Sequence, residues 1–250
     1  MEYQAKWIRL EPVGYSACPL REKLLHGNSF NVVARGLDKK TAQHTSAVYA
    51  DGQWFKAVNY YDKQRFGLPE GPYVAQDIGS AIISGDYSKA TSIYLKSGNA
   101  SLDFPNGVPN DPLAMIDNRK LQFFLSAYNS ILWNQELSDK FGKDTIKFEI
   151  FKGHIVALPK SREFDNSIEK VFSRPELSLS QNVGIQSKTK ERIVFTESRV
   201  FAGLLYDDVY HPGKYAIDLA FYLPSGCYAT LFVRQLLEFT NSITGQYLQA

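Results

Sequence analysis

The sequence predicts an α+β protein, in which strands and helices follow one another irregularly along 250 residues. Three observations carry this prediction. Residues 120–141 repeat apolar side chains at the spacing of a helix. Residues 214–223 alternate bulky and smaller side chains, as a half-buried strand does, and a turn at Leu223-Pro224-Ser225-Gly226 leads into a second helical pattern at 228–239. No internal repeat is present, which excludes a solenoid.

The first quarter of the chain is predicted to hold short strands and one helix. Residues 6–10 have the pattern of a strand. Two apolar runs flank Gly27-Asn28, a dipeptide typical of hairpin turns, so a loop is expected at 27–28. An amphipathic helix is expected within residues 39–56.

The composition excludes several classes of protein. Hydrophobic residues at 44% and charged residues at 22% are typical of an ordinary folded protein. No apolar run reaches the length of about 18 residues that a membrane span needs, and the N-terminus has no signal-peptide pattern, so no membrane partner and a cytoplasmic location are expected. The cysteines and histidines have no ligand spacing, so no metal site is expected; they are Cys18, Cys227, His26, His44, His154 and His211.

The charge distribution does not decide the function. The net charge is only +2. Residues 1–67 hold 10 Lys and Arg against 6 Asp and Glu, and residues 151–205 hold 9 against 6. Two basic segments are compatible with a phosphate-bearing partner, and equally with an ordinary solvated surface.

Four local patterns carry a resemblance to a known family. In order, they are LLHGNSF at 24–30, NYYDKQRFG at 59–67, FFLSAYNSILWNQELSDKF at 123–141 and FYLPSGCYATLFVRQLL at 221–237. Each pattern alone is weak, but together they resemble the C-terminal two-thirds of the TruD family of tRNA pseudouridine synthases. The resemblance implies that residues 1–56 and 204–250 form part of a pseudouridine synthase catalytic domain. It also implies that residues 57–203 form the insertion domain of this family.

In the first pattern, Gly27, Asn28 and Phe30 match the family's Gly-Asn-x-Phe. A pseudouridine synthase takes a uridine out of its stack, and the resemblance implies that the ring of Phe30 stacks on that base, beside a basic cleft between the two domains. Asn28 is expected to bond the backbone or the RNA and to fix the loop. The alternative is a plain hairpin turn, with Phe30 as the first core residue of the next strand.

The second pattern resembles the family's Asn-Tyr-Phe-Gly-x-Gln-Arg-Phe-Gly. Gln64 and Arg65 match, and they are candidates either for binding RNA phosphate or for rigidifying the loop. Asp62 stands where the family has glycine, so the local turn is expected to differ if that turn needs a positive φ.

The fourth pattern supplies the remaining candidates. Ser225 and Gly226 precede a helix, whose N-terminus is suited to receive an RNA phosphate, while the alternative is that Ser225 only caps the helix. Arg234 matches the arginine of the family's helix and is expected to bind RNA or to pair with an acidic residue, including the catalytic one. Gln235 replaces the more usual glutamate.

The resemblance also implies what these 250 residues lack. The family uses one aspartate and no cofactor, and this aspartate belongs to a Gly-x-Lys-Asp-x-x-Ala-x-Thr-x-Gln motif before Gly-Asn-x-Phe. No such motif precedes Gly27, so no catalytic residue is assigned. We expect a truncated or split enzyme, with tRNA and a separately encoded N-terminal fragment as partners. Asp38 lies in a similar segment with Asp and Lys transposed, and is a weak decoy that fits a helix cap better.

The expected activity is isomerisation of uridine to pseudouridine, at position 13 of a tRNA by family analogy. Two alternatives stay open at this point. One is a catalytically inactive RNA-binding pseudoenzyme of the same family. The other is a decayed fragment that folds poorly and leaves an open sheet edge.

Overall fold

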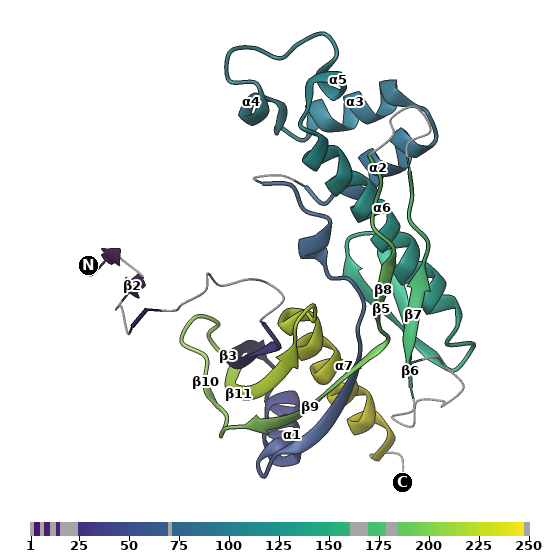
Figure 1. Ribbon diagram of the computed structural model, residues 1–250. Coiled ribbons are helices and arrows are strands. Elements are labelled where there is room, and N and C mark those ends of the chain that lie inside the picture. Colours follow the sequence, from purple (N-terminus) through teal and green to yellow (C-terminus); the bar gives the residue numbers. More distant parts are fainter. Residues whose placement is uncertain are drawn as a thin grey trace.

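The computed structural model describes residues 3–5, 8–10, 14–15, 25–69, 72–160, 170–178 and 185–247. It combines antiparallel strands with helices, which confirms the predicted α+β class (Figure 1). The strands are β1 (Tyr3–Ala5), β2 (Ile8–Leu10), β3 (Gly27–Leu37), β4 (Gln53–Val58), β5 (Thr145–Phe151), β6 (His154–Pro159), β7 (Val171–Arg174), β8 (Lys190–Ile193), β9 (Phe195–Ala202), β10 (Tyr206–Asp207) and β11 (Tyr215–Pro224). The helices are α1 (Lys39–Tyr49), the 3₁₀ turn η2 (Lys63–Arg65), α2 (Ala75–Ile83), α3 (Tyr87–Lys96), α4 (Ala100–Asp103), α5 (Pro112–Met115), α6 (Asn118–Asp139) and α7 (Ala229–Tyr247).

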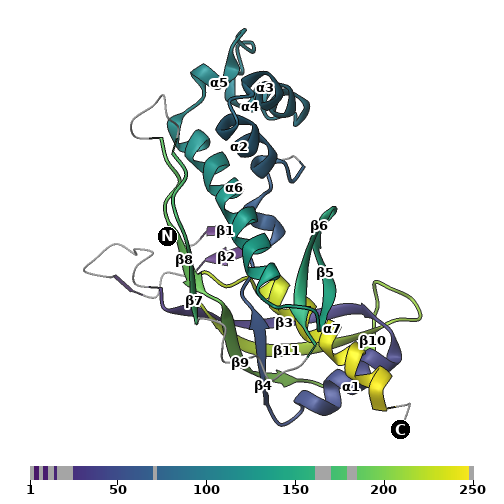
Figure 2. The same cartoon turned by 90° about the vertical axis from the view of Figure 1, so that its right-hand side faces the viewer.

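The larger sheet has five strands, in the order β10-β11-β9-β4, with β3 paired to β11. Helices α1 and α7 pack on one face of this sheet (Figure 2). The face is apolar because β11 alternates, burying Leu219, Phe221 and Leu223 while Asp218 and Tyr222 stay exposed. The ring of Phe221 lies 5.0 Å from that of Phe232 on α7.

The hairpin turn predicted at Gly27-Asn28 is wrong. Both residues lie inside β3, where Gly27 pairs with Pro224 and Asn28 with Leu223 of β11. The glycine serves close approach here, since a Cβ on Gly27 would collide with the Leu223 carbonyl oxygen and the Tyr222 hydroxyl. The dipeptide therefore begins a long antiparallel pairing between two segments far apart in the sequence.

The helix expected within residues 39–56 forms as α1 but ends at Tyr49. Residues Gln53–Val58 become the edge strand β4 instead, paired along its length with β9. The helix expected at 120–141 is confirmed as α6, and the strand-turn-helix at the C-terminus is confirmed as β11 and α7.

A helical part, α2 to α6, rises from the sheet and has its own core (Figure 1). Helix α6 joins the two parts because its side chains enter both cores. Phe124 and Leu125 pack with α2 and α3, whereas Trp133 and Leu137 pack in the core of the sheet. At about 1.5 Å per residue the helix is long enough to reach from one core to the other.

The described part of the chain shows two plain absences. None of its helices is both long and apolar enough to cross a membrane. Nor does that part bring together three His, Cys, Asp or Glu side chains that could hold a metal ion.

Helix α2 crosses α6 at Gly79, where a Cβ would run into the carbonyl group of Phe124. We expect Gly79→Ala to destabilise the protein by roughly 1–3 kcal/mol, because backbone on the far side cannot give way. Urea unfolding measures this. Gly203→Ala is the matched control, since the nearest atoms to its Cβ would lie at 3.6 Å, an ordinary contact. Equal stability of the two variants would contradict this packing.

Candidate functional site

All four sequence patterns meet where the sheet joins the helical part. The amide of Ser225 donates to the His26 carbonyl at 3.0 Å, which ties the turn after β11 to the start of β3. Arg192 of β8 reaches the same place: its Nη2 donates to the Gly226 carbonyl at 2.9 Å and to the Asn59 side-chain oxygen. We call this region the junction.

Two side-chain amides hold the backbone that crosses the junction. Gln235 of α7 accepts from the Val58 amide at 2.9 Å and donates to the Val58 carbonyl at 2.8 Å. Asn134 of α6 does the same to Tyr61, at 2.8 Å and 2.9 Å. Gln235 and Asn134 are fully buried. The segment between β4 and η2 is thus fixed from both parts of the molecule by what we call the amide clamps.

The clamp at Asn134 rests on a neutral histidine. The Asn134 amide nitrogen lies 3.3 Å from His154 Nε2, and the imidazole is buried against the rings of Phe66 and Phe151. Burial lowers the pKa of His154 from 6.5 to about 4. At neutral pH this histidine is therefore uncharged.

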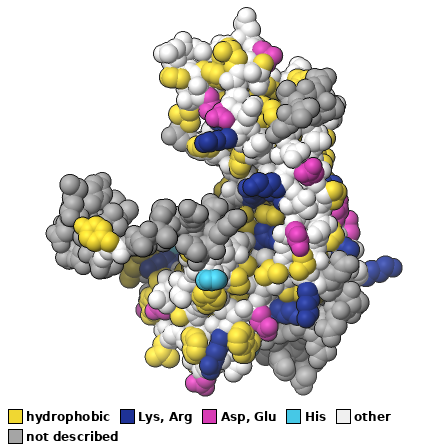
Figure 3. Space-filling model, viewed as in Figure 1, with side chains coloured by type: hydrophobic (Ala, Val, Ile, Leu, Met, Phe, Trp, Pro, Cys, Tyr) yellow, Lys and Arg dark blue, Asp and Glu magenta, His cyan; other side chains and the backbone are white. Residues whose placement is uncertain are grey.

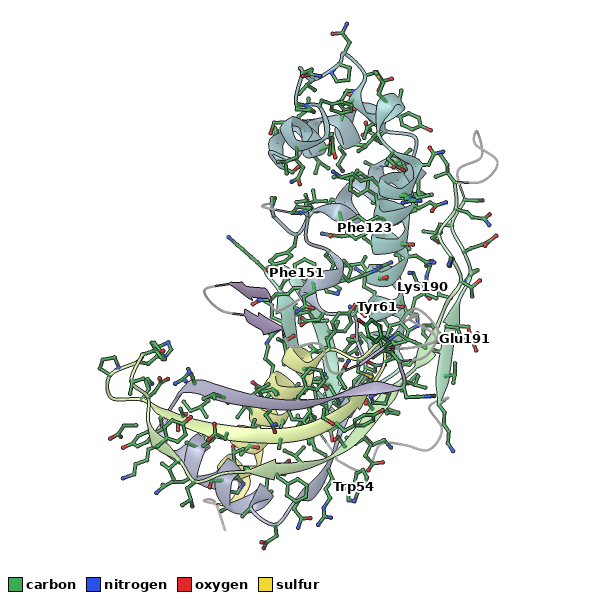
Figure 4. The ribbon with its side chains drawn as sticks, turned by 60° about the vertical axis from the view of Figure 1, so that its left-hand side comes forward. Trp54, Tyr61, Phe123, Phe151, Lys190 and Glu191 are labelled. Carbon is green, nitrogen blue, oxygen red and sulfur yellow. The ribbon has the colours of Figure 1, made fainter. Side chains whose placement is uncertain are left out.

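Cationic side chains lie around the half-buried ring of Tyr61. The guanidinium of Arg192 lies 4.0 Å from the centre of the Tyr61 ring, and the Lys190 ammonium lies 5.8 Å from it. The Arg192 guanidinium is also 5.7 Å from the ring of Tyr228. The charge of Arg65, on η2, also acts on Lys190 and Tyr228. Figure 4 shows Tyr61 and Lys190 side by side between the helical part and the sheet.

Phe30 lies on β3 and is half-buried, stacked on Phe221 with ring centres 5.4 Å apart. A cavity of about 450 Å³ borders it. The expectation of a basic cleft at Phe30 is not met, because this cavity has one arginine and one glutamate among mainly apolar and aromatic neighbours, which include Trp54, Phe201 and Tyr222.

Three other predicted residues lie at the exposed surface of the junction. Asn28 is exposed at the start of β3, and Ser225 and Gly226 form the exposed turn after β11. Gly226 has φ +87°, a conformation that strains other residues. Helix α7 begins only at Ala229, so Ser225 stands several residues before it. Gln64 is exposed on η2.

Arg65 and Arg234 differ in the contacts that their guanidinium groups make within the protein. Arg65 is half-buried, donates Nε–H to the Ser130 hydroxyl at 3.3 Å and lies 5.9 Å from the centre of the Phe123 ring. Arg234 donates to the Ile150 carbonyl at 3.0 Å and to the Glu149 carbonyl, so its guanidinium fastens α7 to β5.

Asp62 fits its position without the glycine that is usual in the family. Its φ is −87°, and its carboxylate accepts from the Lys63 amide at 2.7 Å and from the Thr230 hydroxyl at 2.5 Å. Arg234 lies 4.0 Å from it. The carboxylate thus fastens η2 to α7.

Asp38 caps α1. Its carboxylate accepts from the Thr41 amide at 2.9 Å and from the Thr41 hydroxyl at 2.6 Å, and these bonds lower its pKa. Asp38 follows the last residue of β3, whereas Asn28 stands near the first. At about 3.3 Å per strand residue the two ends are roughly 30 Å apart.

The sequence did not single out Lys190, Arg192 or Tyr228 for the junction. Lys190 and Arg192 lie in a short strand outside all four patterns, and the only sign of them was the excess of Lys and Arg in residues 151–205. Because Lys190 and Arg192 occupy alternate positions of a strand, their side chains lie on the same face. The spacing does not show that this face contacts Tyr61.

A helix-covered antiparallel sheet, a helical insertion between two of its strands and a cationic junction define a two-part α+β protein suited to an anionic ligand. A sequence profile of the family described as tRNA pseudouridine synthase D (TruD) matches residues 1–102. Over these residues the chain is similar to the TruD family.

Named relatives and a solved structure agree. The chain is 25% identical over 311 residues to the probable tRNA pseudouridine synthase D 1 of Methanococcus maripaludis, covering 92% of this chain and 77% of that protein. It is 24% identical over 308 residues to the tRNA pseudouridine synthase D of Leptospira interrogans, covering 93% and 75%. The crystal structure of the putative TruD of Methanosarcina mazei has the same fold, with a TM-score of 0.50 and 19% identity, covering 86% of this chain and 69% of that one.

These alignments are longer than the chain itself, so the relatives carry residues that have no counterpart here.

His154 gives the junction a measurable acid response. Because its pKa is lower in the folded state than in the unfolded chain, the unfolded state binds the extra proton between pH 6.5 and about 4. The contribution of the neutral imidazole to stability is complete above pH 6.5 and is lost as the pH falls through about 4.

We therefore expect the free energy of unfolding to fall more steeply between pH 6.5 and 4 in the wild type than in His154→Gln. Urea unfolding at several pH values in this window measures both slopes. Identical slopes would show that the histidine is not held neutral.

Proposed function

We propose that this chain works as a TruD-type tRNA pseudouridine synthase, converting a uridine of tRNA into pseudouridine, with position 13 as the target. The observation that carries the proposal is the meeting of all four family patterns at one junction, through Ser225, Arg192 and the amide clamps. The names of the relatives favour a synthase over the inactive RNA-binding alternative.

The surface of the junction supports an RNA ligand. Figure 3 shows Lys and Arg side chains, with hydrophobic ones among them, on the face where the helical part meets the sheet. Positive charge attracts the phosphate backbone, and exposed rings offer a surface on which bases stack. A tRNA lying against this face would contact both parts of the molecule.

We assign roles by this proposal. Phe30 stacks on the extruded uridine with the ring face opposite Phe221, and Asn28 contacts the RNA beside it. Gln64, Arg65 and the exposed turn at Ser225 and Gly226 contact phosphates. Arg234 acts indirectly, by holding α7 against β5.

The division into two domains stays part of the proposal. In it, residues 1–56 and 204–250 belong to the catalytic domain and 57–203 to the insertion. Since β9 (Phe195–Ala202) pairs with β4 and β11, we propose that the insertion proper lies between β4 and β9. The cytoplasm, where tRNA is modified, is the proposed location.

Catalysis in this proposal depends on an aspartate supplied from outside the 250 residues, in the Gly-x-Lys-Asp segment of the family. Asp38 is a poor substitute, because its carboxylate is bound to Thr41 at the far end of β3. Even a misplacement of about 1 Å costs a catalytic group about a hundredfold in rate.

We expect the 250-residue chain alone to form no pseudouridine on unmodified tRNA. We expect activity when an N-terminal fragment of a TruD relative carrying the Gly-x-Lys-Asp motif is added, and none when the aspartate of that fragment is changed to asparagine. Asp38→Asn is the matched variant and should leave the mixture active. Activity of the lone chain that disappears in Asp38→Asn would refute the assignment.

A further inference from the structure

Three cationic side chains, those of Arg65, Arg192 and Lys188, act electrostatically on Lys190 at the junction. Burial first, and then the charges of Arg65, Arg192 and Lys188, lower the pKa of Lys190 from 10.5 to about 7. All three neighbouring charges oppose protonation, and the side chain itself is half-buried. The protein therefore holds this ammonium under electrostatic repulsion.

Part of the hydrogen-bonding capacity of this group is unused. The Nε–H of Arg192 is buried and has no acceptor within the described residues. Its Nη2 donates to the Gly226 carbonyl and the Asn59 side-chain oxygen, which holds the guanidinium over the Tyr61 ring. An arginine held in this way is oriented for a ligand before the ligand arrives.

The acidic side chains nearby do not neutralise the group. The charge of the Asp62 carboxylate acts on Tyr228, as do those of Arg65 and Arg192. The oxygens of Asp62, however, already accept hydrogen bonds from the Lys63 amide and the Thr230 hydroxyl. Glu191 lies between Lys190 and Arg192 in β8, and its exposed side chain alternates to the other side of the strand (Figure 4).

We propose that Arg65, Lys190 and Arg192 form a binding site for one phosphate group of the RNA backbone, beside the Tyr61 and Tyr228 rings. The geometry supports a phosphodiester: Lys190 and Arg192 come from alternate positions of one strand, Arg65 approaches from η2, and two aromatic rings flank them. Arg65 and Arg192 offer planar donors, and Lys190 offers a point charge. The identification of the anion as RNA phosphate rests on the proposed function.

Binding at this site is coupled to a proton. A bound anion favours the charged form of Lys190, so the lysine takes up a proton on binding above about pH 7. The groups that face it are the cationic side chains of Arg65, Arg192 and Lys188 and the rings of Tyr61 and Tyr228, and burial raises the pKa of the Tyr228 hydroxyl. Affinity should therefore be highest below pH 7 and should fall as the pH rises.

The first experiment uses inorganic sulfate, whose oxygens are placed as in phosphate and whose charge does not change near pH 7. Sulfate replaces chloride at constant ionic strength, and the shift of the thermal unfolding midpoint is measured at pH 6 and pH 9. The wild type should be stabilised more at pH 6. Lys190→Met should lose most of the shift at pH 6, whereas the exposed Lys152→Met should keep it.

The second experiment measures affinity for unmodified tRNA. Lys190→Met should bind about tenfold more weakly, as expected for one lost charged contact, and the slope of log affinity against log salt should fall by about one. Lys152→Met should match the wild type.

Equal sulfate shifts in Lys190→Met and the wild type, or a wild-type shift that is the same at both pH values, would overturn the site. Binding of poly-glutamate without any response to sulfate or tRNA would overturn it too, in favour of an acidic peptide. The sulfate arm needs neither tRNA nor pseudouridine formation. A response to sulfate without tRNA binding would keep an anion site and reject only its identification with RNA.

Discussion

The structure depends on two pairs of hydrogen bonds that hold a short piece of backbone in place. Gln235 and Asn134 each accept from a backbone amide and donate to the carbonyl of the same residue, at Val58 and at Tyr61. The bonds to Val58 are buried and those to Tyr61 are partly buried. The loss of one clamp leaves donors and acceptors without partners, at a cost of about 1–3 kcal/mol for each buried group. The amide clamps thus set where the helical part stands against the sheet.

The other contacts of the junction depend on the position of the backbone that these clamps hold. The fixed segment includes Asn59, whose side-chain oxygen accepts a hydrogen bond from Arg192. Arg192 also donates to the Gly226 carbonyl in the turn after β11. That turn is bonded to the residue before β3, the strand that carries Phe30. A ligand lying across the junction would therefore meet groups whose positions are set by one connected set of bonds. This is how a binding surface is pre-organised before its ligand arrives.

Sequence patterns predicted the elements whose periodicity is strong, and missed what depends on distant pairing. Helix α6 and the β11-to-α7 unit form as expected because their apolar spacing is long and regular. Gly27-Asn28 was wrongly placed in a turn, since only the pairing with Leu223 and Pro224 makes it the start of a strand. Lys190 and Arg192 escaped notice because a four-residue strand has no periodicity that shows its partner.

The most direct test of the convergence at the junction is backbone hydrogen exchange of the 250-residue chain, with and without unmodified tRNA at low salt. Our account predicts that tRNA slows exchange together in three stretches far apart in sequence, at residues 59–65, 188–192 and 225–228, while the sheet end near Asp38 is unchanged. Protection confined to one of these stretches, or found only near Asp38, would contradict the claim that the family patterns form one RNA-facing site.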